Sequence, residues 1–333
     1  MKTKDLLHRL PENARILLIR LRSMGDCLLL TGPVRALKEE FPGLRISVLV
    51  EKRFAACFSG NPDFHEVLIA KGKYRTAVRL FFRRFHVIVN LHGGPTSLTY
   101  SLLAHGKRVG VEHYRLSFLY HGLLPPPDSS AHTVETTMAG FRWLGVKQET
   151  APALRFEKHE GEAGQIEKTL RGRPYAVIHP GSVMATKRWD PGRFAAVART
   201  LMTRGLTIVV TAGPGEESFA SEVARQIDGS VILLSLSIPQ LGELIRSAKL
   251  YVGNDSGPMH LAAAVGTPVV VPWGSSDSRR WRPWAVDHRV VQNPFECNPC
   301  PGYRCLVAES PLCIESVTAE QVTEAAEELM SRR

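Results

Sequence analysis

The stretch LYVGNDSGPMHLAAAVGTPVVV, residues 250–271, decides the fold class. Its two ends, residues 250–253 and 268–271, are short apolar runs typical of strands that are buried on both faces. Between them, Ser256 can cap a helix, Pro258 suits the first helical turn, and small apolar residues follow. A strand, a helix and a second strand in this order predict a βαβ unit with a parallel sheet.

The same alternation of apolar runs and helical patterns extends over most of the chain. Further strands are predicted at residues 15–21, 46–50, 66–69, 86–91, 107–111, 175–179, 206–211 and 230–234. Helices are predicted at residues 32–41, 191–204, 216–227 and 239–247. Because the rhythm occurs twice, we expect an α/β protein with two doubly wound parallel-sheet domains.

The polar, Gly- and Pro-containing stretch between about residues 150 and 173 interrupts this rhythm and predicts a domain boundary. We expect domains at 1–155 and 172–316, followed by a C-terminal helix over 317–333. That helix opens with a Thr-x-x-Gln capping pattern at Thr318, and in such proteins a last helix often packs back on the first domain. Ligands of open α/β sheets bind at the carboxyl ends of strands, so we expect a site in a cleft between the sheets.

Composition is that of a globular protein, with 44% hydrophobic and 22% charged residues among 333. The 42 Lys+Arg against 32 Asp+Glu give a net charge of +10, which excludes an acidic disordered protein. This charge indicates an anionic partner: a nucleic acid, a phosphorylated small molecule or an acidic membrane surface. No apolar run reaches the roughly 18 residues that span a bilayer, and the start lacks a signal-peptide pattern, so we expect a cytoplasmic protein.

The pair Gly25-Asp26 follows the first predicted strand and opens a helix. The chain has no GxGxxG and no GxxxxGK[ST] loop, so a dehydrogenase or P-loop ATPase would lack its usual phosphate cradle. One interpretation makes Asp26 a carboxylate that satisfies free amides at the helix start. The other makes it a general base that faces the cleft.

After strand 175–179, Gly181 and Ser182 are followed by Lys187 and Arg188. These residues suit a phosphate site, in which backbone amides approach the anion, Ser182 donates and Lys187 neutralises. A turn with a solvated Lys-Arg pair explains the pattern equally well.

Two further loops carry polar groups after strands. Glu216 and Glu217 follow a Gly-Pro-Gly turn and can accept ribose hydroxyls, or can simply favour a first helical turn. The helix after Ser256 presents free N–H groups and its positive dipole end to an anion such as a diphosphate. His260, one turn into that helix, adds a donor there.

Together and in this order, SMGD (23–26), HPGS (179–182), TKRW (186–189) and GNDSGPMHLAAAVGTPVV (253–270) resemble glycosyltransferase family 9. This family comprises the bacterial ADP-heptose:lipopolysaccharide heptosyltransferases. The resemblance covers nearly the whole chain, including the Trp-rich SSDSRRWRPW at 275–284. It implies the GT-B fold, two facing Rossmann-like domains with the nucleotide held mainly by the C-terminal one, and transfer of L-glycero-D-manno-heptose with inversion.

By position, the resemblance makes Asp26 the catalytic base and Lys187 the lysine that stabilises phosphate. The donor-binding residues that it implies are Ser182, Glu216 or Glu217 for ribose, and Asp255, Ser256, Gly257 and His260 around the diphosphate. Chemistry agrees, because the acceptor hydroxyl must lose a proton and the leaving ADP gains charge. No Asp-x-Asp pair is present, so we expect metal-independent transfer without a cofactor.

The resemblance also implies an anionic acceptor, lipid A–Kdo or a heptosylated core, at the first domain. Asn90 and His92 stand where many members of the family have an acidic residue and an arginine; we predict acceptor binding by Asn90, His92, Arg75 and Arg79. Helical spacing places Arg75, Arg79 and Arg83 on one face. That face either docks on the inner-membrane surface or the acceptor, or is a solvated side over packed apolar residues. The enzyme would then be peripheral on the inner face of that membrane.

Cys297, Cys300, Cys305 and Cys313 have the spacing C-x2-C-x4-C-x7-C. Four thiolates can hold a structural zinc ion, although the usual signature has two separated C-x-x-C pairs. Reduced packed thiols or disulfides are the alternative. An iron–sulfur cluster fits less well, because nothing else indicates redox chemistry.

Three other functions are weighed against heptose transfer. A GT-B enzyme could use another nucleotide sugar for a different surface glycan. A nucleic-acid-binding protein is disfavoured, because the positive residues are dispersed and no recognised module is present, so we expect no nucleic-acid partner. The third is a non-catalytic sugar-binding protein of this fold, and Asp26, as a candidate general base, argues against it.

Overall fold

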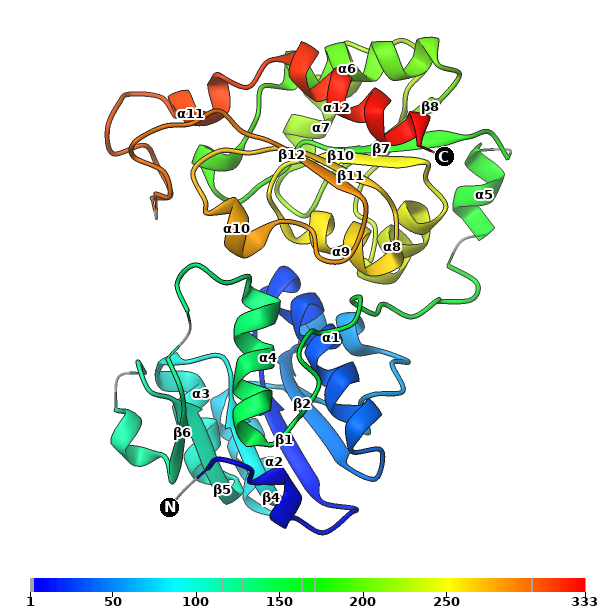
Figure 1. The fold of residues 1–333 in the computed structure, drawn as a ribbon. Coiled ribbons are helices and arrows are strands. Elements are labelled where there is room, and N and C mark those ends of the chain that lie inside the picture. The colour runs from blue at the N-terminus through cyan, green and yellow to red at the C-terminus, as the bar shows by residue number, and fades with distance from the viewer. Residues whose placement is uncertain are drawn as a thin grey trace. The chain divides into compact units, whose positions relative to one another are not determined.

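The computed structural model describes residues 3–114, 116–126, 128–162, 164–170, 172–300 and 302–332. The chain forms two compact units, Met1–Glu157 and Lys158–Arg333 (Figure 1). Each unit is built on a six-stranded sheet whose neighbouring strands are all parallel. The predicted α/β class with two doubly wound parallel sheets is therefore confirmed.

The first sheet has the strand order β3-β2-β1-β4-β5-β6. Its strands are β1 Arg15–Ile19, β2 Arg45–Glu51, β3 Glu66–Ala70, β4 Arg84–Asn90, β5 His105–Val111 and β6 Gly122–Leu124. Its α-helices are α1 Met24–Glu40, α2 Lys73–Phe81, α3 Gly94–Leu103 and α4 Thr133–Leu144. It also has the 3-10 helices η1 Leu7–Arg9, η2 Lys52–Phe58 and η3 Ser117–Leu119. α1 packs on α4, and α2 packs on α3.

The second sheet has the order β12-β11-β10-β7-β8-β9. Its strands are β7 Tyr175–His179, β8 Thr207–Thr211, β9 Val231–Leu233, β10 Leu250–Gly253, β11 Val269–Pro272 and β12 His288–Val291. The helices of this unit are α5 Gly164–Leu170, α6 Pro191–Thr203, α7 Glu217–Ala224, α8 Ile238–Arg246, α9 Gly257–Val265, α10 Ser278–Trp281, α11 Leu312–Glu315 and α12 Ala319–Ser331, with the turn η4 Ala185–Lys187. Figure 1 shows α6, α7 and α12 over one face of the sheet and α8 and α9 over the other.

Both sheets reverse their winding direction at the centre, where β1 lies beside β4 and β7 lies beside β10. At such a switch point the loops after the two strands leave toward opposite faces and leave room for a ligand at the carboxyl edge. The loops after β1, β4, β7 and β10, with the first turns of the helices that follow them, carry eight of the predicted site residues: Asp26, His92, Ser182, Lys187, Asp255, Ser256, Gly257 and His260. The topology therefore brings them to one edge within each unit.

The C-terminal helix α12 belongs to the core of the second unit. Val322, Ala325, Ala326 and Leu329 recur at helical spacing and are buried in the cluster that includes residues of α6 and β7. Thr318 caps the helix as predicted: its Oγ1 accepts the Gln321 amide N–H at 3.3 Å. The apolar face of α12 is thus used within the second unit.

Helix α1 begins earlier than the prediction of 32–41. It starts at Met24 and runs to Glu40 with Pro33 in its interior. A Cβ on Gly32 would lie 2.7 Å from the Pro152 carbonyl oxygen, so this glycine lets the returning chain pass close to the helix. The pair Gly32-Pro33 therefore lies inside the helix, at a close backbone approach.

Two edge strands, β6 and β12, were not predicted from the sequence. β6 has three residues, and all four residues of β12 are half-buried. Short edge strands of this kind lack the continuous apolar run by which the other strands were found. No helix in the part of the chain that the structure describes is long and apolar enough to cross a membrane.

Replacing Gly32 with Ala tests the close approach of α1. Gly→Ala inside an exposed helix stabilises by about 0.5–1 kcal/mol. Here the added methyl group meets a backbone oxygen, so we expect the free energy of unfolding to fall by about 1–3 kcal/mol in urea titrations. Gly164→Ala is the control, since a Cβ there meets nothing within 4 Å among the described residues. Equal stability of the Gly32→Ala and natural proteins would contradict this packing.

Candidate active site

The second unit gathers three polar loops at the carboxyl edge of its sheet. They follow β7, β8 and β10, and they contain the predicted residues Ser182, Lys187, Glu216 and Asp255. Because β7 lies between β8 and β10, the three loops are neighbours.

Asn254 fastens two of these loops together. Its side chain is fully buried; Oδ1 accepts the Trp189 amide N–H at 3.1 Å, and Nδ2 donates to the Pro180 carbonyl at 2.7 Å. The segment from Pro180 to Trp189 is thereby held against the end of β10. Asn254 was not among the predicted site residues, although a side-chain amide directly after a buried strand is a signal that it can link neighbouring loops.

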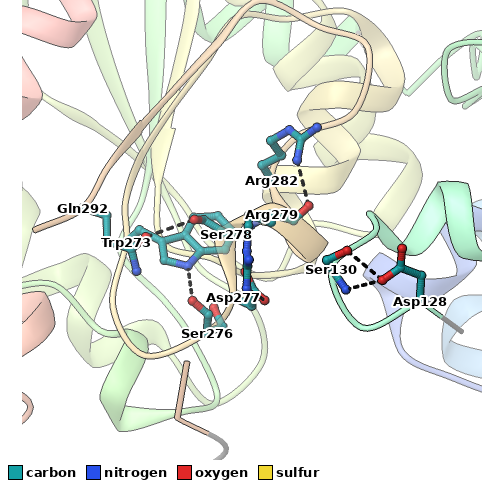
Figure 2. A network of polar contacts seen from close by, with 9 residues as sticks. All are labelled: Asp128, Ser130, Trp273, Ser276, Asp277, Ser278, Arg279, Arg282 and Gln292. Carbon is teal, nitrogen blue, oxygen red and sulfur yellow. Dashed lines mark hydrogen bonds and ion pairs between the residues drawn. The ribbon is translucent and has the colours of Figure 1, made fainter. Parts of the chain in front are cut away.

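Lys187 and Asp255 form a close ion pair, with Nζ 2.6 Å from Oδ2. The Asp255 side chain is only 5% exposed and that of Lys187 16% exposed, so the pair is largely withdrawn from solvent. The Ser276 hydroxyl also donates to Asp255. Ser276 is itself held in place, because the Trp273 indole N–H donates to its carbonyl at 2.8 Å (Figure 2).

Ser182 and Arg188 shape the loop after β7. The Ser182 side chain is 3% exposed, and its carbonyl accepts Arg188 Nε–H at 2.6 Å. The Arg188 guanidinium lies over the Phe219 ring at 4.6 Å, which ties this loop to α7. Arg188 is therefore held beside the anion-binding candidates and is not a freely solvated cation.

Glu216 lies directly before α7 with its carboxylate turned toward β7. Oε2 accepts the Gly213 amide N–H at 3.3 Å and lies 3.5 Å from His179 Nε2. Burial alone would raise the pKa of Glu216, but the hydrogen bond from His179, the Gly213 amide and Arg188 hold that pKa below its ordinary value. Glu217, in the first turn of α7, is half-buried.

Helix α9 starts where the sequence predicts, with Gly257 first and Pro258 in its first turn. The Ser256 side chain makes no capping hydrogen bond to this turn in the described structure, which differs from the prediction. The first-turn N–H groups are therefore not satisfied by Ser256, which suits an anion at this end. His260 is 3% exposed, one turn into the helix.

In the first unit, Asp26 lies at the start of α1, where β1 ends. Its Oδ2 accepts both the amide N–H and the hydroxyl of Ser23 at 3.0 Å, and Oδ1 lies 3.4 Å from Arg20 Nη1. The side chain is 23% exposed. Asp26 thus caps the helix and also presents a carboxylate at the carboxyl edge, so the two interpretations of the sequence are compatible.

His92 lines a pocket of about 150 Å³ at this edge, formed after β1, β2 and β4 by residues that include Arg22, Glu51 and Gly93. Burial and then the positive charge of Arg20 lower the pKa of His92, which favours a neutral ring. Tyr114 lies behind Gly93, where burial raises its pKa to about 12. The sequence analysis missed Arg20 and Tyr114; Arg20 carried a signal, as a charged residue directly after a buried strand.

Asn90 differs from its predicted role as a direct acceptor ligand. Its side chain is fully buried: Nδ2 donates to Ser97 and Tyr120, and Oδ1 accepts the His92 and Gly93 amides. Both donor and both acceptor positions of the Asn90 side chain are therefore used within the protein. Asn90 orders the loop that carries His92, and it has no hydrogen-bonding position left for a ligand.

Arg75 and Arg79 are exposed on α2, and the structure does not bring Arg79 to the carboxyl edge. Arg79 Nη2 lies 3.6 Å from Glu66, the first residue of β3, at the amino end of the sheet. The apolar side chains of α2 are only partly packed: Leu80 is 1% exposed in the core, whereas Tyr74 is 88% exposed and Phe82, just after the helix, 80%.

The structure does not support the zinc site at the four cysteines. Cys297 is exposed, Cys300 and Cys305 are half-buried and Cys313 is buried; all are free. Within the described ranges, no three Cys, His, Asp or Glu side chains are grouped so that they could hold a metal ion. Cys300 Sγ and Cys305 Sγ instead accept the Gly302 and Ala308 amides at 3.5 and 3.4 Å, which stabilises loop turns.

Two Rossmann-type sheets with polar loops at their carboxyl edges define the GT-B glycosyltransferase fold, and solved structures share it. A glycosyltransferase family 9 structure from Veillonella parvula matches with a TM-score of 0.84 over 96% of this chain and 98% of its own, at 20% identity. The Escherichia coli ADP-heptose LPS heptosyltransferase II matches with a TM-score of 0.80 over 96% and 99%, at 21% identity.

The family model for glycosyltransferase family 9 (heptosyltransferase) matches residues 75–310, and the chain belongs to this family. A lipopolysaccharide heptosyltransferase 3 of Escherichia coli is 29% identical over 291 residues, 80% of this chain and 85% of the relative. A lipopolysaccharide heptosyltransferase 1 of Salmonella typhimurium is 25% identical over 286 residues, 79% and 89% of the two chains.

The Lys187–Asp255 pair predicts a stability effect. Lys187→Met leaves the buried Asp255 carboxylate without its cation, so we expect the free energy of unfolding to fall by about 2–3 kcal/mol. Adding Asp255→Asn removes the stranded charge and restores at least half of the loss in a double-mutant cycle. Arg204→Met is the control, because it breaks the exposed pair with Glu327 and changes stability by under about 1 kcal/mol. A Lys187→Met effect as small as the control would refute the buried pair.

Proposed function

We propose that this family 9 glycosyltransferase moves a heptose from ADP-L-glycero-D-manno-heptose to the inner core of lipopolysaccharide, with inversion at the anomeric carbon. The single observation that carries this is the Lys187–Asp255 pair beside the start of α9, within a chain whose relatives are named lipopolysaccharide heptosyltransferases. The related E. coli heptosyltransferase WaaC was solved with ADP.

In this proposal the domain expected at residues 172–316, which lies within the second unit, holds the donor. Ser182, Lys187 and the first-turn amides of α9 take the diphosphate, aided by Ser256, Gly257 and His260. The Lys187 ammonium group has three N–H donors, so it keeps its contact with Asp255 and also donates to a phosphate oxygen. Glu216, ionised because its pKa is lowered, accepts the ribose hydroxyls, with Glu217 beside it.

The domain expected at residues 1–155, which lies within the first unit, would hold the acceptor. Its hydroxyl oxygen attacks the anomeric carbon as the bond from that carbon to the phosphate oxygen breaks, and the electron pair leaves with ADP. The acceptor proton passes to the Asp26 carboxylate. The charge gained by ADP is stabilised by Lys187 and the helix start. His92 contacts the acceptor from its pocket, while Asn90 orders the loop. No cofactor takes part in this scheme.

Replacement of Asp26 tests the reaction directly. Asp26→Asn keeps an oxygen that can accept the Ser23 N–H but cannot take the acceptor proton, so we expect kcat to fall about 10²–10⁴-fold. ADP binding stays within about twofold. The readouts are heptose transfer from ADP-heptose to a Kdo-bearing or heptosylated core acceptor, and calorimetry with ADP.

Asp128→Asn is the matched control. Asp128 also accepts a serine amide and hydroxyl, from Ser130 at 2.8 and 2.7 Å, but it is exposed (Figure 2). We expect it to keep normal turnover. Near-normal turnover of Asp26→Asn would remove the base assignment. Binding of UDP or GDP in place of ADP would favour the alternative, a GT-B enzyme that uses another nucleotide sugar.

The proposal includes peripheral contact with the inner face of the inner membrane through α2. The helix and its flanks expose Tyr74, Val78, Phe81 and Phe82 at 51–88%, next to exposed Lys71, Arg75 and Arg79. Aromatic side chains together with cations suit the interface of an anionic bilayer. The same charges attract the anionic acceptor.

Sedimentation with vesicles tests this contact. We expect binding to vesicles with phosphatidylglycerol but not to pure phosphatidylcholine. Phe81→Ser with Phe82→Ser, or Arg75→Gln with Arg79→Gln, should weaken binding at least about tenfold, since each basic residue near the surface contributes about 1 kcal/mol. Tyr303→Ser and Arg225→Gln, exposed positions in the second unit, are the controls. Equal binding of the α2 and control variants would exclude α2 as the contact.

A further inference from the structure

A buried histidine and threonine lie behind the carboxylate of Glu216. His179 is the last residue of β7 and Thr211 the last of β8, and each is 1% exposed. His179 Nδ1 lies 3.0 Å from Thr211 Oγ1, and its Nε2 lies 3.5 Å from Glu216 Oε2. The ring therefore bridges the end of β8 and the residue that precedes α7.

The hydrogen positions follow from the chemistry of the three groups. An ionised carboxylate can only accept, so the hydrogen between His179 and Glu216 belongs to Nε2. In a neutral ring Nδ1 then carries only a lone pair, and the Thr211 hydroxyl donates to it. Glu216 thus selects the tautomer that points an N–H at it, and the Thr211 hydroxyl accommodates this tautomer by donating to Nδ1.

Two glycines leave space for the carboxylate on the other sides. A Cβ on Gly181 would lie 2.0 Å from Glu216 Oε2, and a Cβ on Gly213 would lie 3.0 Å from it. The Gly213 amide also donates to the same oxygen. The backbones after β7 and β8 therefore enclose the carboxylate, and His179 fixes its direction.

We propose that His179, backed by Thr211, is a positioning residue that orients the Glu216 carboxylate for the hydroxyls of the donor ribose. The inference rests on the proposed function, in which Glu216 meets that ribose. A carboxylate that is already fixed loses little rotamer freedom on binding, and this raises affinity for a ligand with a diol. At 1% exposure His179 acts through Glu216 and not on the donor.

Comparison of ADP with 2′,3′-dideoxy-ADP separates positioning from general support of the fold. By calorimetry, the natural protein should prefer ADP by about tenfold or more, the value of a charged hydrogen bond. His179→Leu should lower ADP affinity about tenfold and leave dideoxy-ADP within about twofold. His179→Gln, which returns an N–H donor, should recover ADP binding to within about threefold of the natural protein.

Thr211→Val is the second variant, for the case in which His179→Leu does not fold; we expect about threefold weaker ADP binding and unchanged dideoxy-ADP binding. Thr267→Val is the control: it removes a buried threonine hydrogen bond to the Ile245 carbonyl in the same unit and should leave the ratio of affinities unchanged.

The positioning role would be overturned if the His179 and Thr211 variants lost affinity for both nucleotides equally. It would also be overturned if they bound both nucleotides as tightly as the natural protein. If the natural protein binds ADP but does not discriminate against the dideoxy analogue, the contact of Glu216 with ribose is wrong and the inference falls with it. If it binds no ADP, the proposed function itself is refuted.

Discussion

The parallel pairing of β7 with β10 is the constraint on which the rest of the site depends. It places His179 and Gly253 side by side at the ends of two strands whose loops leave in opposite directions. The groups proposed for the diphosphate follow these two ends, and Glu216, proposed for the ribose, follows the neighbouring strand β8. The pairing of β1 with β4 does the same in the first unit, where it aligns Ile19 with Asn90 and sets Asp26 and His92 on the same edge.

The polar groups of the second unit are organised before any ligand binds. Asn254 holds the loop from Pro180 to Trp189, Asp255 holds Lys187, and His179 holds Glu216. Each contact is largely buried, so the groups need little rearrangement to meet a diphosphate and a ribose. Fixed donors and charges of this kind are what stabilise a leaving group that gains negative charge.

Much of this could be predicted from the sequence, because buried parallel strands are continuous apolar runs and their loops carry the chemistry. The runs at 175–179 and 250–253 match β7 and β10 at both ends. What could not be predicted depends on contacts distant in the chain. The Pro152 backbone passes so close to α1 that only glycine fits at position 32. The Asn90 side chain is hydrogen-bonded to Ser97 and Tyr120, and α12 packs on α6. Cysteine spacing alone also did not show whether the thiols converge, and the described structure does not group them.

The central claim is that the loops after β7, β8 and β10 together receive the donor nucleotide. Hydrogen–deuterium exchange of the whole protein, with and without saturating ADP, tests it most directly. We expect slower exchange of amides in residues 180–189, 212–217 and 254–260, and little change around residues 84–111. Protection confined to the first unit, or no protection at saturating ADP, would contradict the account.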